Sequence, residues 1–229
     1  MKAIILAAGK ATRLLPLTKE NPQSLLLVGR KTILEHQIDA LRNAGIKEII
    51  IVTGYLSKKI EEFCKHKDVI IQFNPFYEVS GMVHSLWVAR EYISGDMILL
   101  YSDLLFDTEI VSGLSRQKGD ICLAIKKNGI REEAEQVFES GGFIKKIGKS
   151  MADANGEFVG LSKFSIGGSK KLILEMNNIS KMNLYSSFIN ILGRIIESDG
   201  KILSYEIGIS HFVDIDFPVD LTKARKIFG

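Results

Sequence analysis

The first part of the chain alternates short apolar runs with segments in which apolar residues recur at helical spacing. Buried strands are predicted at residues 2–6, 48–53, 69–73 and 97–101, and helices at 31–44, 56–66 and 80–92. Strands that alternate with helices form a parallel sheet with helices on both faces. The first 125 residues therefore predict an α/β fold built on a Rossmann-like, mostly parallel sheet.

The pattern changes after residue 125. Short strand-like segments at 135–138, 143–147 and 158–164 predict a small antiparallel side layer. Helical spacing returns at 168–176 and 184–199, late strands are expected at 202–207 and 212–215, and Pro218 marks the first turn of a closing helix. No repeat or linker-like composition divides the chain, so we expect a single domain over residues 1–229.

Composition and charge narrow the class of protein. Hydrophobic residues make up 46% and charged residues 25% of the chain, as in an ordinary globular protein. The net charge of +3 and the dispersed basic residues argue against a nucleic-acid partner. Cys64 and Cys122 stand apart, and neither they nor the histidines show zinc or disulfide spacing.

The apolar runs are also too short for a membrane protein. None approaches the roughly 20 residues that span a bilayer, and the apolar run at the N-terminus is too short for a secretory signal. We therefore expect a cytoplasmic protein with no membrane partner. The sequence leaves open whether it forms a homo-oligomer.

The first predicted strand runs into a loop of small residues, Leu6-Ala7-Ala8-Gly9-Lys10-Ala11-Thr12-Arg13. Small residues let backbone N–H groups approach an anion closely, and Lys10 and Arg13 add positive charge. Because Ala11 and Leu14 occupy the later glycine positions, the loop is not a dinucleotide-binding G-x-G-x-x-G, nor is it a Walker A motif. The loop predicts a phosphate-binding site, and a plain strand-to-helix turn is the alternative.

Residues 3–29 resemble the N-terminal signature of the sugar-phosphate nucleotidyltransferase superfamily, because the loop, Arg13, Pro22 and Leu25-Leu26 stand at that signature's spacing. Further similarity at residues 81–89, 142–149, 157–165 and 213–221 is closest to the short cytidylyltransferases that act on phosphocholine, inositol phosphate or aminoethylphosphonate. The resemblance implies a GT-A-like fold. It also implies transfer of a nucleoside monophosphate from an NTP, with CTP favoured, to a small phosphate- or phosphonate-bearing acceptor with release of pyrophosphate.

The resemblance also assigns roles to individual residues. It implies nucleotide binding by Leu6, Ala7, Ala8, Gly9, Lys10, Ala11, Thr12, Arg13, Asn74, Ser80 and Ser85. It implies acceptor binding by Lys149, Glu157 and Gly160, and catalytic roles for Arg13, Gln23 and Lys149. For Lys149 and Glu157 an exposed surface position is the alternative, and for Ser80 the alternative is a helix N-cap.

Three carboxylates are candidate metal ligands. Asp103 follows a buried strand, and the carboxyl end of a central parallel strand faces the ligand crevice of an α/β sheet. Asp214 and Asp216 stand two residues apart, on one face of a strand. Such oxygen ligands suit Mg²⁺, and the resemblance implies that Asp103 and one of this pair bind it, with Asp216 favoured. A turn position for Asp103 and an N-cap for Asp216 are the alternatives.

Two residues depart from the superfamily signature. Ala11 replaces a glycine, which costs little if the backbone there stays at negative φ. Gln23 replaces a lysine, and its amide donates hydrogen bonds without carrying charge. The sequence therefore leaves two alternative functions open. One is a sugar-1-phosphate pyrophosphorylase that uses UTP, dTTP or GTP, and the other is a catalytically weakened nucleotide-binding regulatory protein.

Overall fold

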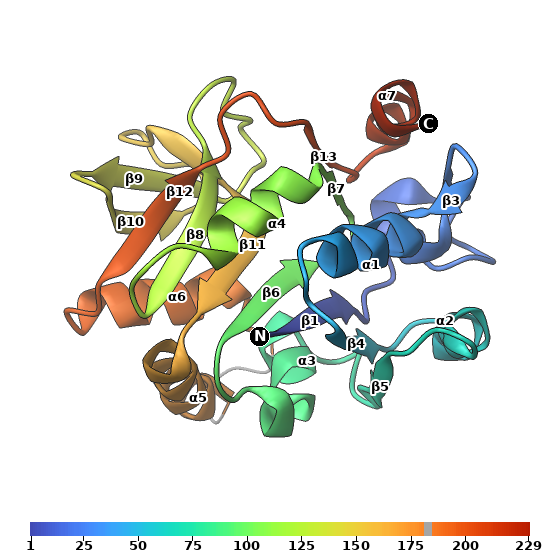
Figure 1. Cartoon of the computed structure of the whole chain (residues 1–229), viewed down its shortest axis with the longest axis horizontal. Helices are drawn as coiled ribbons and strands as arrows, with labels where there is room; N and C mark the ends of the chain where they lie inside the picture. The colour runs from blue at the N-terminus through green and yellow to red at the C-terminus, as the bar shows by residue number, and fades with distance from the viewer. Residues whose placement is uncertain (181–184) are drawn as a thin grey trace.

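Nine strands form one continuous sheet, which the computed structural model shows through the middle of the molecule (Figure 1). The structure describes residues 1–180 and 185–229, so the start of the helix expected at 184–199 lies outside the described residues. The strands are β1 (Lys2–Ala7), β2 (Leu27–Val28), β3 (Lys31–Thr32), β4 (Glu48–Thr53), β5 (Ile70–Phe73), β6 (Met97–Tyr101), β7 (Leu104–Phe106), β8 (Ile121–Lys126), β9 (Gln136–Ser140), β10 (Phe143–Gly148), β11 (Gly156–Phe164), β12 (Ile202–Glu206) and β13 (Phe212–Asp214). The helices are α1 (Ile33–Asn43), α2 (Ser57–Cys64), α3 (Met82–Val88), α4 (Thr108–Ser115), α5 (Ile166–Ser180), α6 (Phe188–Glu197) and α7 (Pro218–Phe228).

The strand order of the large sheet is β5-β4-β1-β6-β11-β8-β12-β10-β9. Every strand except β10 and β11 runs in the same direction, which confirms the mostly parallel sheet. The late antiparallel strands do not form a layer of their own. β11 lies in the centre, between β6 and β8, because all nine of its residues are buried and need neighbours on both sides. The β9–β10 hairpin lies at one edge of the sheet, and β5 forms the opposite edge.

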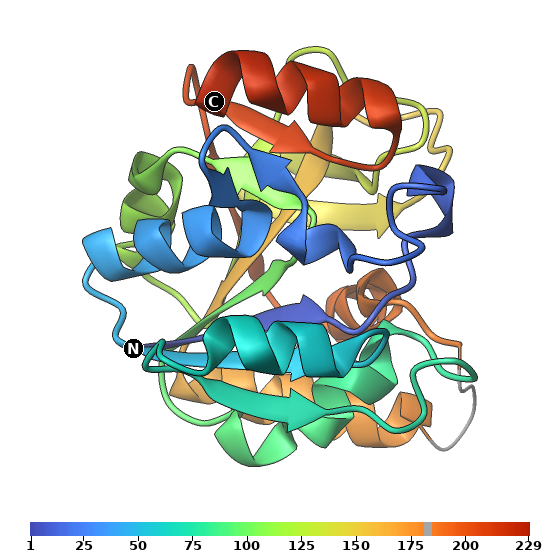
Figure 2. The same cartoon turned by 90° about the vertical axis from the view of Figure 1, so that its right-hand side faces the viewer.

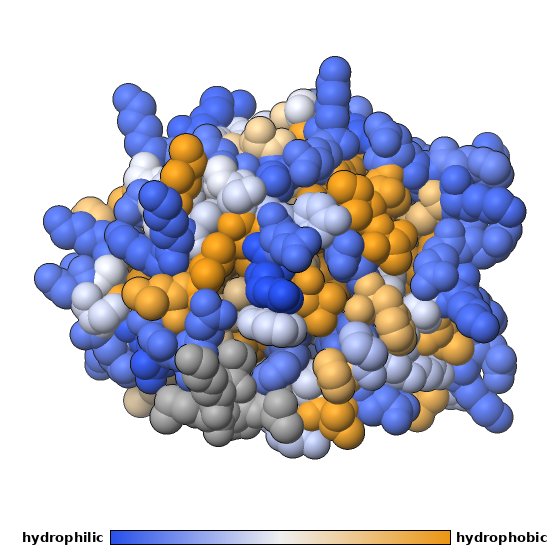
Figure 3. All heavy atoms as spheres, turned by 90° about the horizontal axis from the view of Figure 1, so that it is seen from below, coloured by the Kyte–Doolittle hydropathy of each residue, from blue (hydrophilic) through white to orange (hydrophobic). Residues whose placement is uncertain are grey.

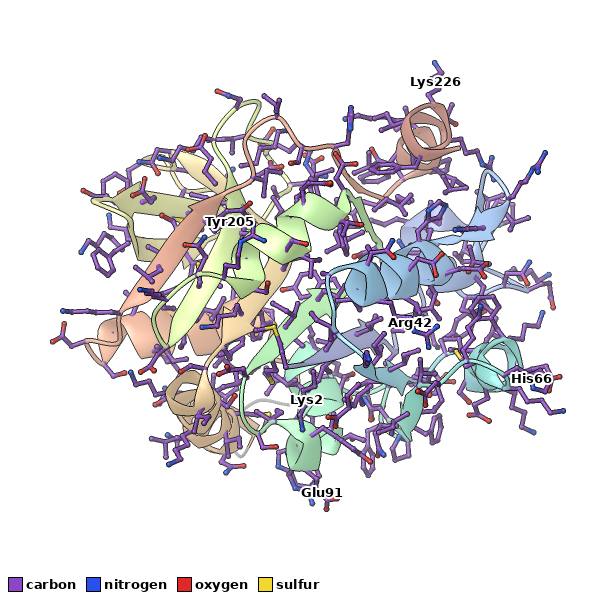
Figure 4. All side chains as sticks on the ribbon, in the orientation of Figure 1. Lys2, Arg42, His66, Glu91, Tyr205 and Lys226 are labelled. Atoms are coloured by element: carbon purple, nitrogen blue, oxygen red, sulfur yellow. The ribbon has the colours of Figure 1, made fainter. Side chains whose placement is uncertain are left out.

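Helices cover both faces of the sheet, as the alternating pattern predicted. Along β1, Ile4 and Leu6 face the core shared with α3, α5 and α6, whereas Ile5 faces the core shared with α1, α2 and α4. Tyr205 of β12 lies beside α4, where Gly113 leaves room for its ring: a Cβ at Gly113 would lie 1.9 Å from the Tyr205 hydroxyl (Figure 4). The two apolar faces of each central strand explain its continuous apolar sequence.

A third, smaller core joins the two ends of the chain. β7 pairs with β13 in a separate antiparallel ribbon, in which Asp214 lies opposite Leu104. Leu14 and Leu26 from the N-terminal loop pack with Val213 and Ile215 of the C-terminal segment. α7 covers this core beside the β2–β3 hairpin (Figure 2). The result is that residues 6–28, 101–106 and 212–216 meet at the carboxyl ends of β1 and β6.

No helix in the described part of the chain is both long and apolar enough to cross a bilayer. On the face seen from below in Figure 3, polar side chains surround interspersed apolar ones, so this face is not one continuous apolar patch.

Candidate active site

Asp103 lies in the turn between β6 and β7, and two backbone hydrogen bonds tie that turn to other segments. The Ser102 backbone N–H donates to the Leu6 carbonyl at 3.3 Å, which ties the turn to the end of β1. The Ile215 N–H donates to the Asp103 carbonyl at 3.0 Å, which ties it to the C-terminal segment. The predicted position of Asp103 at the carboxyl end of a central strand is therefore found.

Three cavities meet at Asp103. The first is lined by Leu6, Ala7, Ala8, Gly9, Pro22, Gln23, Ser24, Tyr77, Ser80, Gly81, Met82, Ser85, Tyr101, Ser102 and Asp103. The second is lined by Arg13, Met82, Tyr101, Asp103, Leu104, Arg131, Glu133, Ala134, Glu135, Lys149, Phe158, Val159, Gly160, Asp214 and Asp216. The third is lined by Gly9, Ala11, Thr12, Arg13, Gln23, Asp103 and Asp216. Most of the residues predicted for the nucleotide, the acceptor and the metal thus surround one carboxylate.

The carboxylates of this centre repel one another. Burial raises the pKa of Asp103 well above its usual range, and the charges of Asp214 and Asp216 raise it further. Burial, followed by the charge of Asp216, also raises the pKa of Asp214 to about 6. Two arginines oppose this repulsion: Arg131 Nη2 lies 3.0 Å from Asp214 Oδ2, and Arg13 Nη1 lies 3.0 Å from Asp216 Oδ1.

Asp216 does not cap the last helix, so that alternative is wrong. The carboxylate that caps α7 is Asp220, which accepts from the Phe217 N–H at 2.8 Å and from the Asp216 N–H at 3.2 Å. The Asp216 side chain is left to face Arg13 and the third cavity.

The donor set fits a divalent cation that binds together with phosphates. Asp103 Oδ1 is buried and has no hydrogen-bond partner among the residues that the structure describes. Within residues 1–180 and 185–229, no three acidic, histidine or cysteine side chains are already gathered as a protein-only metal site. Mg²⁺ usually takes only one or two carboxylates and completes its shell with water and substrate phosphate oxygens. The buried, unpaired oxygen beside two further carboxylates meets that requirement.

The phosphate loop has one conformation that the sequence did not predict. Ala11 has φ +47° and ψ +54°, so the negative φ at which replacing glycine would cost little is not found. The left-handed residue directly precedes the short helix Thr12–Leu14. Gly9 lines the first and third cavities, whereas the Lys10 ammonium pairs with Glu78 at 2.9 Å and lines neither. Arg13 supplies the positive charge at the third cavity.

The polar residues predicted for nucleotide binding form one hydrogen-bonded group. Asn74 is buried, and its Nδ2 donates to Ser85 Oγ at 3.0 Å and to Ser80 Oγ at 3.4 Å. Ser80 and Ser85 line the first cavity, and Asn74 supports them from behind. Gly81, rather than Ser80, is the N-cap of α3, so the capping alternative for Ser80 is wrong.

Gln23 lies at the same centre as Asp103. It lines the first and third cavities, and its Nε2 donates to the Ile215 carbonyl, between Asp214 and Asp216. The neighbouring Ser24 lines the first cavity, and its buried Oγ lacks a partner in the described part of the chain.

The predicted acceptor residues divide into two groups. Lys149 and Gly160 line the second cavity. Gly160 has φ +75°, and a Cβ there would lie 2.8 Å from Leu104 Cδ1, so only glycine fits this wall without strain. Glu157 is fully buried behind the cavity, where its Oε2 accepts from the Arg131 N–H at 2.9 Å. It holds the loop of Arg131 rather than lining the acceptor space.

Arg131 and Glu135 are among the side chains of the second cavity that the sequence did not predict. Arg131 comes from a loop without periodic pattern, and its only signal was its charge. Burial raises the pKa of Glu135 to about 7, and its Oε2 accepts from the Tyr101 hydroxyl at 2.9 Å. Both residues act through contacts with distant strands, which local sequence does not reveal.

The chain is similar to known proteins in sequence and in fold. Residues 2–132 match the family described as nucleotidyl transferase. The CTP:phosphoglutamine cytidylyltransferase of Campylobacter jejuni is 28% identical over 96% of this chain and 98% of that protein. The 2-aminoethylphosphonate cytidylyltransferase of Lancefieldella rimae is 31% identical over 78% of this chain and 73% of that protein.

The solved structure of the CTP:phosphocholine cytidylyltransferase from Streptococcus pneumoniae has the same fold. It matches with a TM-score of 0.83 at 23% identity, covering 100% of this chain and 99% of that one. The family match confirms the resemblance seen at residues 3–29. The chain belongs to the nucleotidyl transferase family and is a nucleotidyltransferase enzyme.

Proposed function

We propose that this protein is a Mg²⁺-dependent cytidylyltransferase that transfers CMP from CTP to a small phosphate- or phosphonate-bearing acceptor and releases pyrophosphate. The observation that carries the proposal is the meeting of three cavities at Asp103. The first and third cavities suit the nucleoside and triphosphate, and the second cavity suits the acceptor. The relatives named above support CTP, since each is named for cytidylyl transfer.

The reaction needs no nucleophile from the protein. An oxygen of the acceptor phosphate or phosphonate attacks the α-phosphorus of CTP. The bond from that phosphorus to the oxygen bridging to the β-phosphate breaks, and pyrophosphate leaves with the electron pair. The protein's contribution to such a transfer is mainly positioning and electrostatic stabilisation.

The cations of the site would position the two substrates. A guanidinium has five N–H donors, and each arginine contacts a carboxylate with only part of them. Arg13, at the third cavity, therefore retains donors for the triphosphate, and Arg131 and Lys149 have donors for the acceptor phosphate. The backbone of Gly9 and Thr12 lines the same space as Arg13 and would cradle the phosphates.

Asp103, together with Asp214 or Asp216, would hold the Mg²⁺ ion. The ion supplies positive charge against the triphosphate and the departing pyrophosphate.

A pyrophosphate-release screen tests the proposal. The enzyme would be incubated with Mg²⁺ and each of CTP, UTP, dTTP, GTP and ATP, against phosphorylated alcohols, phosphonates and sugar 1-phosphates. We expect release with CTP and a phosphorylated alcohol or phosphonate. Release with UTP, dTTP or GTP and a sugar 1-phosphate would support the pyrophosphorylase alternative. CTP binding without turnover on any acceptor would support the regulatory alternative, which Gln23 favours.

A further inference from the structure

Gln37 of α1 is a buried polar residue that contacts the turn of Asp103. Its side chain is 1% exposed, and its Nε2 donates to the Tyr101 carbonyl at 2.9 Å and to the Leu104 carbonyl at 2.8 Å. Tyr101 and Leu104 directly flank Ser102 and Asp103. One side-chain amide therefore bridges the two ends of the turn that carries the candidate metal ligand.

The chemistry of the partners fixes the orientation of this amide. Both partners are carbonyl oxygens, which only accept, so the NH₂ group of Gln37 must face them. The opposite atom, Gln37 Oε1, is buried without a hydrogen-bond partner among the described residues. An apolar side chain would avoid that unpaired oxygen. An apolar side chain could not, however, donate the two hydrogen bonds that the Gln37 amide gives to the turn.

The position of α1 makes Gln37 a fixed support. The helix begins at Thr32, whose side chain accepts from the Glu35 N–H at 3.1 Å, a regular N-cap. Ile33, Leu34, Ile38 and Leu41 bury the helix in the core. Gln37 thus extends from a rigid element toward the turn.

The hydrogen bond from Gln37 to Leu104 also affects the position of Asp214, the second candidate metal ligand. Leu104, whose carbonyl accepts from Gln37, lies opposite Asp214 in the β7–β13 ribbon. The Asp103 carbonyl in turn accepts from the Ile215 N–H. Fixing both ends of the turn therefore fixes the spacing between Asp103 and Asp214.

We propose that Gln37 is a positioning residue that holds Asp103 and Asp214 at the spacing needed to bind a divalent cation with the nucleotide. The inference rests on the proposed function, since it concerns the same metal. Gln37 touches neither substrate nor the reacting atoms. Outer-shell partners of metal ligands typically change metal affinity or activity by about 10–100-fold when replaced.

The test compares Gln37→Met with the wild-type enzyme. Methionine keeps the length and most of the volume of the side chain and removes both donors. Mn²⁺, which binds to the same kind of oxygen ligands as Mg²⁺, would be titrated into enzyme with CTP and no acceptor, and free Mn²⁺ followed by electron paramagnetic resonance. We expect the Mn²⁺ dissociation constant to rise at least tenfold, while the affinity for the acceptor, measured without metal, changes less than twofold.

Ser162→Ala is the matched control. Ser162 Oγ also donates from a buried side chain to a carbonyl of β6, that of Leu99 at 3.4 Å, but it does not touch the turn. The control should leave Mn²⁺ affinity within twofold of the wild type. A thermal melt of each variant separates a general loss of stability from a change at the metal.

The outcomes are distinguishable. A folded Gln37→Met variant with wild-type Mn²⁺ affinity overturns this inference alone. Failure of the wild-type enzyme to bind Mn²⁺ in the presence of CTP overturns the proposed metal site and this inference together. If the methionine variant does not fold, Gln37→Asn replaces it in the test. Asparagine keeps the amide but is shorter by one methylene, and its Mn²⁺ affinity is compared with that of the wild type in the same way.

Discussion

Replacing Asp103 by asparagine should abolish turnover and stabilise the protein at the same time. Asp103→Asn keeps the shape of the side chain and removes a negative charge that burial, Asp214 and Asp216 all disfavour. If Asp103 serves the metal, turnover should fall by about 10³-fold or more, since charge aimed at the transferring phosphate is lost. A residue kept for stability would show the opposite effect on the melting temperature.

The sign of the stability effect follows from the raised pKa of Asp103. A carboxyl group whose pKa is higher in the folded than in the unfolded state stabilises the fold at low pH. That stability is lost as pH rises through the folded pKa. The asparagine variant should therefore melt close to the wild type at pH 5 and above it at pH 8. Removing a poorly compensated buried carboxylate should raise the free energy of unfolding by about 1–3 kcal/mol. For a domain of this size, that corresponds to a rise in melting temperature of roughly 2–10 °C.

The assay is thermal unfolding without metal at the two pH values, together with turnover under Mg²⁺. Asp107→Asn is the matched control, because Asp107 accepts from the His211 N–H at 2.7 Å and lines none of the three cavities. The control should keep turnover within about threefold of the wild type. If Asp103→Asn turns over as fast as the wild type, the metal assignment is refuted. If the variant melts at a lower temperature than the wild type at pH 8, the electrostatic reasoning is refuted.

Four further predictions concern the same centre. Arg13→Ala should weaken CTP binding at least tenfold with little change in acceptor binding; equal losses by calorimetry would contradict its placement at the triphosphate. Ala11→Gly should relieve a left-handed backbone, by about 1 kcal/mol, and raise the melting temperature by roughly 2–4 °C; an unchanged or lower value would contradict the strain. Because the folded pKa of Glu135, about 7, lies above its ordinary 4.5, stability should fall as pH rises between these values; Glu135→Gln should flatten that slope, and an unaltered melting profile would count against it. Gln23→Lys should raise kcat about tenfold by adding charge near the transferring phosphate, and single-turnover rates at or below the wild type would show that another cation fills this role.

The fold was predictable wherever local sequence determines burial. Continuous apolar runs predicted β1, β4 and β6, because both faces of each strand are covered. The neighbours of β11 were not predictable, since an apolar strand pattern does not specify which strands it pairs with. β7 was missed because three residues show no periodicity, although this short strand aligns Asp214 with the Asp103 turn.

The residues of the candidate site likewise fall into those that the sequence predicted and those that it did not. Arg13, Asp103 and Asp216 lie together as expected, because their motifs stand at strand ends that converge in an α/β sheet. Gln37 and Arg131 were not recognised, since their roles depend on contacts 64 and 83 residues away in the chain. The left-handed Ala11 was missed because alanine gives no signal for that conformation.

Nucleotidyl transfer at Asp103 is tested most directly by ³¹P NMR of the enzyme with CTP, Mg²⁺ and the best acceptor from the screen. We expect paired resonances of a new diphosphate linkage, or of a phosphonate–phosphate linkage, with one pyrophosphate formed for each. The same mixture with Asp103→Asn should stay unchanged over the time in which the wild-type reaction completes. Phosphate or pyrophosphate release without a linked product, or equal product formation by Asp103→Asn, would contradict nucleotidyl transfer at this centre.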